Sequence, residues 1–566
     1  EGLADGVHTV NGNILSLSDE EMAMIEEAKA NFDKVIVLVN AANPMEIANL
    51  QDDPDIDAIL WVGYPGAYGF YAVADVLNGT VAPSAHLGDT FVKNGALAPA
   101  MQNFGNIPWA NASDFAEGTS VNSYLIENEG IYTGYRYYET RYADIVLGNG
   151  GANASDGTVA TSDGTWSYDN EVVYPFGYGM SYTTFEQTLD NLNVDLENET
   201  VTANVTVKNT GSVAGKDVVQ LYVSLPYTDY DKEHGVEKAA IQLLDYGKTA
   251  ELAPGASETV TITADMQNMA SWDSTADNAV GTKGCYILDA GDYYFTAATD
   301  AHNAVNNILA AKGYTVENTD GRMTADGDVA LTYKWTNAAL DSTTYATSET
   351  GTAITNLFDE SDPNKSSDAP GSVTWMSRSD WTGTIPTAPA QLTANETLAA
   401  SLAFTKYDGS EANSVEMPTL GAKNGLTLAS MIGKDFDDPE WDTLLDQLTY
   451  SEMVQTITLG FHNTAAAASI GKAATKDENG PQGLTAALTG GASAMCYTSE
   501  DVMAATFNTD LINEVGRCIG EDCLAMGYSG LYGPGINMHR TAYSGRNFEY
   551  YSEDPFVAGT ICAAEV

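Results

Sequence analysis

The sequence predicts a multidomain protein that combines α/β regions with an all-β region. The chain has 566 residues, which at roughly 100–200 residues per domain corresponds to three or four domains. Apolar runs alternate with helical patterns near the start, the apolar period becomes two in the middle, and helical patterns return from about residue 437. Such a change of period along a chain is typical of separate α/β and β modules.

Residues 1–110 carry a βαβ pattern. Ser18 and Glu21 have the spacing of a capping box, and apolar residues at helical spacing follow them. The apolar runs 35–39 and 58–62 are continuous, which predicts two strands of a parallel sheet that are buried on both faces. Together these patterns predict a mostly parallel sheet with covering helices.

The middle of the chain changes character twice. Residues 111–185 crowd aromatic side chains among glycines, which predicts long loops that cover a surface and complete the preceding domain. From 186 to 305 the apolar period is two, as in Val201–Lys208 and Val218–Val223, so we expect a β-sandwich of immunoglobulin or fibronectin type. Residues 306–436 predict a connecting segment with local strands.

The last region, residues 437–566, again has the pattern of βα units. Thr449 and Glu452 form a second capping box. Residues 509–526 predict a helix with Leu511, Val515, Ile519 and Leu524 on one side, and a short apolar strand, 529–532, follows. The chain stops within a helical pattern, so we expect a polypeptide that is cut short.

Composition excludes several partners. There are 24 Lys and Arg against 78 Asp and Glu, a net charge of -54 that repels phosphate backbones, so we expect no nucleic-acid partner. The chain has no run of about 18 apolar residues and therefore no expected membrane span. The five cysteines show neither a disulfide framework nor a zinc spacing, and we expect small buried apolar side chains at Cys285, Cys496, Cys518, Cys523 and Cys562.

Four blocks of sequence carry a family resemblance. Near the start stand NFDKVIVLVNAANPMEIANL and DAILWVGYPGAYGF, followed by EGIYTGYRYYET and VVYPFGYGMSYTTF. Toward the end stand NGPQGLT, ATFNTDLINEVG and GPGINMHRTAYSGRNFEYYSEDPFVAGT. With the β-sandwich between them, they resemble glycoside hydrolase family 3, whose β-glucosidases combine an α/β-sandwich domain, a fibronectin type III-like β-sandwich and a (β/α)8 barrel.

The resemblance implies an order of domains. Residues 1–110 are then part of the α/β-sandwich domain, 111–185 complete it, 186–305 are the fibronectin type III-like module, and 437–566 are the first part of the barrel. In most members the barrel comes first, so this chain resembles the subgroup with reversed order, with parts missing at both ends. A shared site requires that the first 110 residues pack against residues 440–566.

The resemblance also implies an activity. It points to a retaining exo-β-glycosidase, similar to β-glucosidases, that removes non-reducing terminal sugars from short β-linked glycans and needs no cofactor or metal. Its substrate is an oligosaccharide or an aryl or alkyl β-glycoside. A β-xylosidase or another β-glycosidase of the family is the alternative. Oligomeric state and compartment, cytoplasmic or secreted, stay open.

Catalysis of this kind needs two carboxyl groups about 5–5.5 Å apart, a nucleophile and an acid/base. By resemblance the acid/base falls at Glu1, where a Gly-Glu-Gly-like loop is expected. The family's nucleophile lies in a Ser-Asp-Trp-like motif late in the barrel, and the sequence Ser379-Asp380-Trp381 precedes the barrel blocks instead. We therefore interpret Asp380 as a residue of an ordinary turn and expect the nucleophile to lie outside this chain, which alone should be inactive.

Four residues match the family's sugar-binding positions. Arg546 and Glu549 correspond to the loop that holds the non-reducing sugar, and a guanidinium offers several donors to neighbouring hydroxyls. Where the family carries Asp before Gly-Pro, this chain has Asn479, with Asp477 two residues earlier. This departure puts a preference for glucose in doubt.

Other polar and aromatic residues of these blocks are expected to be structural. We interpret Arg540 and Glu553 as members of ion pairs, and Tyr135 and Tyr138 as packed core residues in preference to a sugar subsite. The histidines at 86, 462 and 539 have no metal-ligand spacing. Two other functions are considered: a non-catalytic carbohydrate-binding or scaffold fragment, and a nucleotide-binding α/β protein, which the missing Gly-x-Gly-x-x-Gly loop disfavours.

Overall fold

The structure is a computed structural model that describes residues 14–116, 122–159, 164–387, 390–403, 409–485 and 491–566. The chain forms two compact units. The first consists of Glu1–Ala403, Thr498–Thr509 and Ile536–Ala563. The second consists of Phe404–Tyr497, Asp510–Gly535 and Ala564–Val566. Within the first unit, segments from both ends of the chain therefore fold together.

The predicted βαβ pattern is present near the start. Helix α1 (Asp19–Asn31) begins with the expected capping box, and strands β1 (Ile36–Val39) and β2 (Ala58–Trp61) are parallel. Helix α3 spans Gly69–Leu77. The expectation that β1 is buried on both faces is wrong, because Ile36 is 48% and Leu38 39% exposed. A parallel strand is buried on both sides only where other elements cover both faces of its sheet. In the described part of the chain, other elements cover only one face of β1.

The region expected to consist of loops contains a buried helix. Helix α4 (Tyr135–Leu147) follows Gly134 and ends at Gly148 in the left-handed conformation. Tyr135 and Tyr138 are buried, which confirms the core interpretation of both. The sequence of 111–185 does not predict this helix, because tyrosine is a weak helix former and glycines surround it. The helix forms because tertiary packing outweighs local helix propensity. Around α4 lie short elements: η2 (Gly95–Leu97), η3 (Pro99–Asn103), β4 (Ile107–Pro108), η4 (Ala112–Asp114), β5 (Ser123–Tyr124) and α5 (Tyr168–Glu171).

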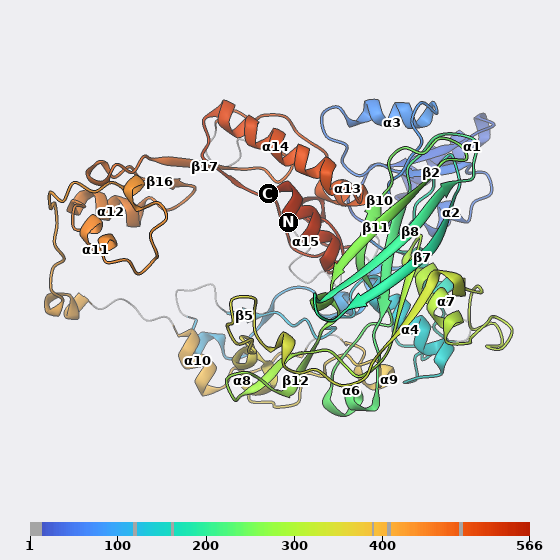
Figure 1. Ribbon diagram of the computed structural model, residues 1–566, viewed down its shortest axis with the longest axis horizontal. Helices are drawn as coiled ribbons and strands as arrows, with labels where there is room; N and C mark the ends of the chain where they lie inside the picture. The colour runs from blue at the N-terminus through green and yellow to red at the C-terminus, as the bar shows by residue number, and fades with distance from the viewer. Residues whose placement is uncertain (1–13, 117–121, 160–163, 388–389, 404–408, 486–490) are drawn as a thin grey trace. The chain divides into compact units, whose positions relative to one another are not determined.

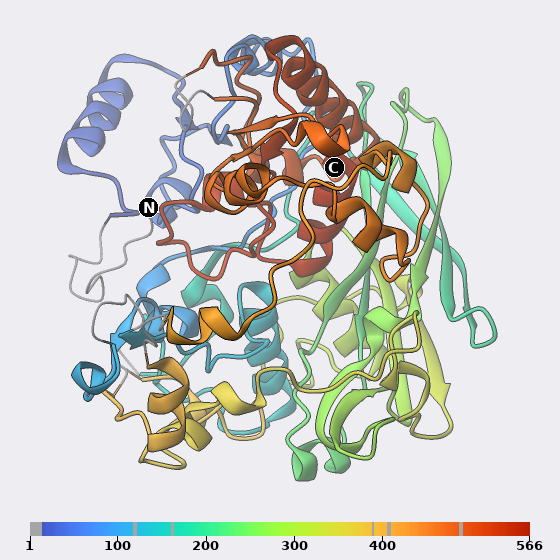
Figure 2. The same ribbon diagram turned by 90° about the vertical axis from the view of Figure 1, so that its left-hand side faces the viewer.

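A β-sandwich follows, and its long strands are visible in Figures 1 and 2. One sheet has the order β11-β8-β7 and the other β10-β9-β14-β15. The first sheet is built from β7 (Phe185–Asp195), β8 (Thr200–Asn209) and β11 (Ser257–Asp265). The second is built from β9 (Val218–Ser224), β10 (Gln242–Lys248), β14 (Gly291–Ala298) and β15 (Thr332–Asn337). The core between them includes the side chains of Val205, Val207, Leu221 and Phe295.

Burial along these strands follows their place in the sandwich. The predicted alternation is found in β8, where every second residue is buried. In β9 all seven residues are buried, so the expected alternation is wrong there. The reason is that β9 is an inner strand of its sheet and other elements, among them helix α7 (Ala301–Ala311), pack on its second face. Strand β15 pairs with β14, so the sheet also draws on residues beyond 305.

The second unit holds short helices and a small sheet. Helix α11 spans Glu440–Leu445 and α12 spans Tyr450–Thr458, which begins with the predicted capping box at Thr449. Strand β16 (Asn463–Thr464) pairs with β17 (Thr475–Asn479), and β17 is parallel to β18 (Gly530–Tyr532).

Helix α14 (Thr509–Met526) exists as predicted, but its buried side differs. Ile512, Ile519 and Cys523 are buried, whereas Leu511 and Leu524 are 48% and 73% exposed. The apolar residues of this helix cover more than one side of it, so its sequence does not decide which side faces the core.

All five cysteines are free. Cys285, Cys523 and Cys562 are buried as expected, whereas Cys496 is exposed, because it lies in a segment without helix or strand before α13 (Glu500–Ala505). Within the described ranges, no helix is long and apolar enough to cross a membrane.

Candidate active site

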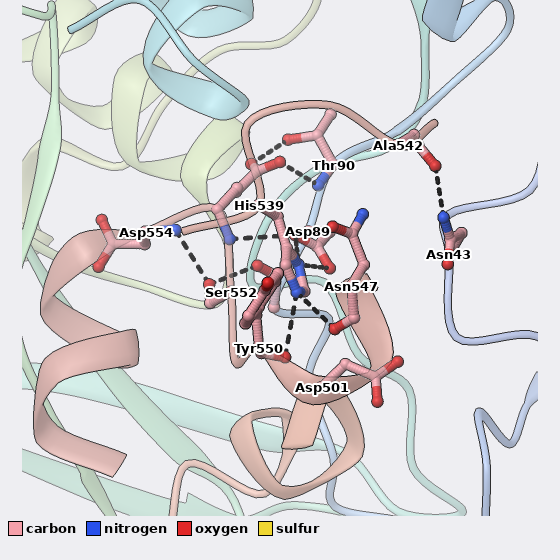
Figure 3. A network of polar contacts seen from close by, with 12 residues as sticks. Asn43, Asp89, Thr90, Asp501, His539, Ala542, Asn547, Tyr550, Ser552 and Asp554 are labelled. Carbon is pink, nitrogen blue, oxygen red and sulfur yellow. Dashed lines mark hydrogen bonds and ion pairs between the residues drawn. The ribbon is translucent and has the colours of Figure 1, made fainter. Parts of the chain in front are cut away.

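The loop that contains Arg546 is held in the first unit by a buried ion pair (Figure 3). His539 precedes this loop, and Asp89 lies just before strand β3 (Phe91–Val92). The Nδ1 atom of His539 lies 2.7 and 2.9 Å from the two carboxylate oxygens of Asp89. The backbone N–H of Glu553 also donates to Asp89, at 3.0 Å. One carboxylate from the first hundred residues thus fixes both ends of the loop.

The second ring nitrogen of His539 faces two backbone carbonyls. Nε2 lies 2.9 Å from the oxygen of Asn547 and 3.0 Å from that of Tyr550. Since every partner is an acceptor, both ring nitrogens must donate, which requires the protonated imidazolium. Burial alone lowers the pKa of His539, but the charge and hydrogen bond of Asp89, together with Asp501, raise it to about 9.

Glu553 anchors the end of the loop to α4. Its carboxylate accepts hydrogen bonds from the Thr90 hydroxyl at 2.7 Å, the Thr90 N–H at 3.0 Å and the Tyr135 N–H at 2.7 Å. Burial, with the negative charge of Asp89, raises the pKa of Glu553. The expectation that Glu553 belongs to an ion pair is wrong, because in the described part of the chain it is satisfied by these neutral donors.

Gly134 makes room for the Glu553 carboxylate. Its φ is +51°, and a Cβ at this position would overlap the carboxylate group. Glycine is therefore favoured at 134 for two reasons: it adopts a positive φ without strain, and it has no side chain to overlap Glu553. Ser552 continues the anchor, because its hydroxyl donates to the Gly88 carbonyl at 2.6 Å and accepts from the Asp554 N–H at 3.0 Å.

Further contacts join the same segments. Asn43 Nδ2 donates to the carbonyls of Ala542 and Ser544, at 2.6 and 2.7 Å. The Tyr543 hydroxyl donates to Glu46 at 3.1 Å. The expected packing of the first 110 residues against the C-terminal region is thereby confirmed for the part of that region that belongs to the first unit.

Arg546 and Glu549 form an ion pair, from Arg546 Nε to a Glu549 oxygen. Arg546 is the N-cap of the short 3-10 helix η12 (Asn547–Glu549) and Glu549 is its last residue, and the Glu549 N–H donates to the Arg546 carbonyl at 3.0 Å. Half of the Arg546 side chain is exposed, whereas that of Glu549 is only 9% exposed. The buried carboxylate thus holds a guanidinium at the surface, where it can donate to the hydroxyls of a bound molecule.

An aromatic side chain accompanies this pair. The ring of Tyr64 lies 6.0 Å from that of Phe548, the middle residue of η12, and Tyr64 is 44% exposed. The carbonyl of Tyr64 accepts from the N–H of Ser499 at 2.9 Å. The exposed Tyr64 ring thus contacts the short helix that follows Arg546, and an aromatic ring offers a surface on which a sugar can stack.

Arg540 has the structural role that the sequence predicts. Its guanidinium pairs with the buried Glu129, with Nη2 at 3.1 Å from Oε2, and it also donates to the Ile126 carbonyl at 2.8 Å. The Arg540 guanidinium therefore donates to both a carboxylate and a backbone carbonyl of the protein.

Asp477 and Asn479 lie in the second unit, on strand β17. Asn479 is the last residue of this strand and is paired in register with Tyr532, the last residue of β18. Its N–H bonds to the neighbouring Glu478 carboxylate at 3.0 Å, and its carbonyl accepts from the Thr485 N–H at 2.8 Å. The two residues flank the buried Glu478.

The two candidates for catalysis have different outcomes. Glu1 lies outside the described residues. Asp380 is the N-cap of the short helix α9 (Trp381–Thr384), and its carboxylate accepts from the Gly383 N–H at 3.0 Å. Trp381 is fully buried and donates to Asp144 at 3.0 Å. The Ser-Asp-Trp sequence is thus part of a turn, as expected.

Sequence reasoning missed the anchoring residues Asp89, Thr90 and the role of His539. A histidine with no metal spacing gave no reason to pair it with a carboxylate 450 positions away. The available signal was local: Asp89-Thr90 and His539 both lie inside the blocks that carry the family resemblance or extend them. Asp501 was missed too, and burial raises its pKa to about 7.

Comparison with known proteins agrees with this architecture. Residues 8–182 match the glycosyl hydrolase family 3 C-terminal domain, and residues 217–299 match a fibronectin type III-like domain. Over 97% of its length the chain is 28% identical to a β-glucosidase of Ruminococcus albus, of which it covers 48%. It is likewise 28% identical to β-glucosidase A of Butyrivibrio fibrisolvens, of which it covers 59%.

A solved structure has a similar fold. The β-glucosidase of Paenibacillus barengoltzii aligns with 97% of this chain and 51% of its own length, with a TM-score of 0.61 at 24% identity. The chain spans about half the length of the curated relatives it matches. These matches confirm the resemblance drawn from the four sequence blocks.

Proposed function

The chain carries the C-terminal domain of glycosyl hydrolase family 3, and from that premise we propose that it is part of a retaining exo-β-glycosidase. Its substrates are then oligosaccharides or aryl and alkyl β-glycosides, from which it removes the non-reducing terminal sugar, as a β-glucosidase does. The observation that carries the proposal is the Arg546–Glu549 pair on a loop fixed by the buried Asp89–His539 contact.

In this proposal Arg546 and Glu549 bind the terminal sugar. A guanidinium held by a buried carboxylate presents donors in a fixed direction, so a sugar hydroxyl meets a preorganised partner. Tyr64 adds an exposed ring that contacts Phe548 of the same short helix. In this proposal these side chains contribute to catalysis by binding and orienting the terminal sugar.

Asn479 and Asp477 are proposed as further sugar-binding residues, on a strand of the second unit. Asn479 ends β17 and is in register with the end of the parallel strand β18. Ligand sites of (β/α)8 barrels are found at the carboxyl ends of parallel strands, so this pairing supports residues 437–566 as the beginning of such a barrel. The amide at 479 donates and accepts without charge.

The reaction itself needs an acid/base and a nucleophile. Glu1 is proposed as the acid/base. No residue of this chain is proposed as the nucleophile, because Asp380 caps a helix and its neighbour Trp381 is buried. Water completes the second step of a retaining mechanism.

Sugar binding by the purified chain tests the proposal directly. Titration of glucose, xylose and methyl β-glucoside, followed by ligand-observed NMR, is expected to show binding that Arg546→Ala abolishes. Arg517→Ala is the matched control, because Arg517 is similarly exposed and pairs with Glu514 at the same spacing of three residues. Equal binding by both variants would remove Arg546 from the site. Preference for xylose over glucose would favour the β-xylosidase alternative.

A second function, a non-catalytic carbohydrate-binding fragment, is supported by the engagement of Asp380 as a cap. Hydrolysis of an aryl β-glucoside tests whether this chain contains a nucleophile. Sugar binding without turnover by the purified chain is the outcome expected from a chain with one catalytic carboxylate. Turnover at ordinary glycosidase rates would require a nucleophile within these 566 residues, and Asp380→Ala would then be the first variant to measure.

A further inference from the structure

A groove of about 1480 Å³ lies in the first unit, and its described lining includes neither Arg546 nor Glu549. Its walls come from the turn between β7 and β8, the segment after β11, the hairpin of β12 (Ser271–Asp277) and β13 (Lys283–Ile287), and the loop around Trp375. These parts are distant in sequence but belong to one compact unit. The volume exceeds the roughly 300–1,000 Å³ typical of small-molecule sites, which indicates a ligand longer than one sugar.

Aromatic side chains line this groove at its surface. Tyr286 is 41% exposed and Trp375 46% exposed. Trp272 is in register with Tyr286 across the hairpin, with ring centroids 5.4 Å apart. Gly284 has a φ of +98°, and a Cβ there would lie 2.8 Å from the Trp272 indole, so the hairpin is built to let this ring lie over it. Exposed rings of this size are costly to hydrate and favour a flat apolar partner.

The polar side chains of the groove include carboxylates, amides and hydroxyls. Carboxylates line it at Glu197, Glu199 and Asp265, and amides at Gln267 and Asn268. Carboxylates accept hydrogen bonds, and amides both donate and accept, which is the complement of a sugar hydroxyl.

Positive charge in the groove is already neutralised. Among the described lining residues, the cationic side chains are Arg136 and Lys238. Lys238 is buried between Asp231 at 2.5 Å and Asp289 at 2.6 Å. Arg136 lies 3.5 Å from Asp554. A ligand with carboxylate or phosphate groups would be repelled by the carboxylates of the lining, so the charge disfavours an anionic ligand.

We propose that this groove is a second binding site, for a neutral glycan chain. Trp272, Tyr286 and Trp375 stack on the sugar faces, and the carboxylates and amides bind the hydroxyls. The glycan as ligand class rests on the proposed function, whereas the aromatic lining and the exclusion of anionic ligands rest on the residues of the groove itself. Such a site would hold a longer substrate on the protein while its end is processed elsewhere.

Binding of defined oligosaccharides to the whole chain tests the proposal. Calorimetric titration with laminaripentaose and cellopentaose is expected to show binding of at least one of them, and polygalacturonate is expected not to bind. The double variant Trp272→Ala/Trp375→Ala is expected to weaken binding at least tenfold. Absence of binding of either pentasaccharide, or an unchanged affinity in the double variant, would overturn the proposal.

A pair of tyrosine variants guards against loss of folding. Tyr286→Ala removes a groove ring, and Tyr333→Ala removes a tyrosine of similar exposure, 39%, on β15 outside the groove. Tyr286→Ala alone is expected to weaken pentasaccharide binding, with both variants melting alike. Equal weakening by both would contradict the assignment.

The two sites are separated by Arg546→Ala. This change is expected to leave pentasaccharide binding in the groove intact even if it abolishes binding of glucose. Loss of pentasaccharide binding in Arg546→Ala together with its retention in the double tryptophan variant would overturn the groove proposal and leave the proposed function standing.

Discussion

The Nδ1 atom of His539 lies 2.7 Å from Asp89, although 450 positions separate the two residues. Both are buried, and the imidazole also faces two backbone carbonyls of the loop that contains Arg546. An ion pair with this many satisfied partners fixes the course of a loop, because breaking one contact leaves a buried charge without compensation. The geometry of the proposed sugar site therefore depends on residues that do not contact the sugar.

Stability is expected to fall as the pH rises from about 6.5 to 9. The pKa of His539 is raised to about 9 in the folded protein, above about 6.5 for an unfolded histidine. Its stabilising effect is therefore complete below the unfolded value and is lost as pH rises through the folded one, on the order of 3 kcal/mol in total. The pKa of Asp501, raised to about 7, and the raised pKa of Glu553 also make stability fall with rising pH, but this loss begins at the unfolded carboxyl pKa of about 4.

Urea unfolding at pH 6, 8 and 10 measures this dependence. Asp89→Asn removes the charge that raises the pKa of His539, so its stability is expected to be lower at pH 6 and to change less with pH than that of the wild type. A wild-type free energy of unfolding that is constant across this range would contradict the assignment of a charged His539.

Gly134→Ala is expected to destabilise the protein more than Gly130→Ala. Both glycines have positive φ, +51° and +56°, so the backbone strain is shared. A methyl group at 134 overlaps the Glu553 carboxylate, whereas nothing lies within 4 Å of one at 130. The difference is expected to be about 1–3 kcal/mol, the usual cost of overpacking. Denaturant midpoints of the two variants measure it, and equal values would mean that Glu553 moves away without cost.

Asp144→Ala is expected to cost much more stability than Asp380→Ala. Asp144 is fully buried and accepts from Arg378 Nε at 3.1 Å and from the Trp381 indole at 3.0 Å. Its removal leaves the buried Arg378 guanidinium without its carboxylate partner. This loss is expected to lower the free energy of unfolding by about 3–5 kcal/mol. Asp380 is an exposed helix N-cap, and replacing such a residue by alanine typically lowers the free energy of unfolding by about 1 kcal/mol. Thermal melting distinguishes them, and a larger effect at Asp380 would show that its carboxylate does more than cap.

Arg546→Ala is expected to lower kcat/KM in a form of the protein that hydrolyses an aryl β-glucoside. The loss is on the order of 2–4 kcal/mol, because a charged hydrogen bond to substrate disappears and Glu549 is left bare. Folding should change little, since half of the arginine side chain is exposed. Arg517→Ala should have wild-type kinetics. An unchanged kcat/KM in Arg546→Ala would exclude Arg546 from the sugar site. A large fall in the melting temperature would instead show that Arg546 has a structural role.

Local sequence patterns were sufficient for many elements. The capping boxes at Ser18 and Thr449 begin helices, and the period of two in β8 gives a strand with one buried face. These features depend on residues within a few positions of one another, so the sequence determines them. The pairing of Arg546 with Glu549, three residues apart, belongs to the same class.

Burial and long-range pairing were decided by the tertiary structure. The exposure of Ile36 and Leu38, the complete burial of β9 and the burial of α4 depend on which elements pack against each face. A sequence states that a side chain is apolar, but not whether another element covers it.

The same distinction holds for the site. The sequence by itself determined the family blocks and, within them, the candidates Arg546, Glu549, Asn479 and Asp477. Only the tertiary structure decided that Asp89 holds His539 and that Glu553 bonds to Thr90 and Tyr135. The physical reason is that a buried charge requires a partner, and the fold alone brings that partner from the other end of the chain.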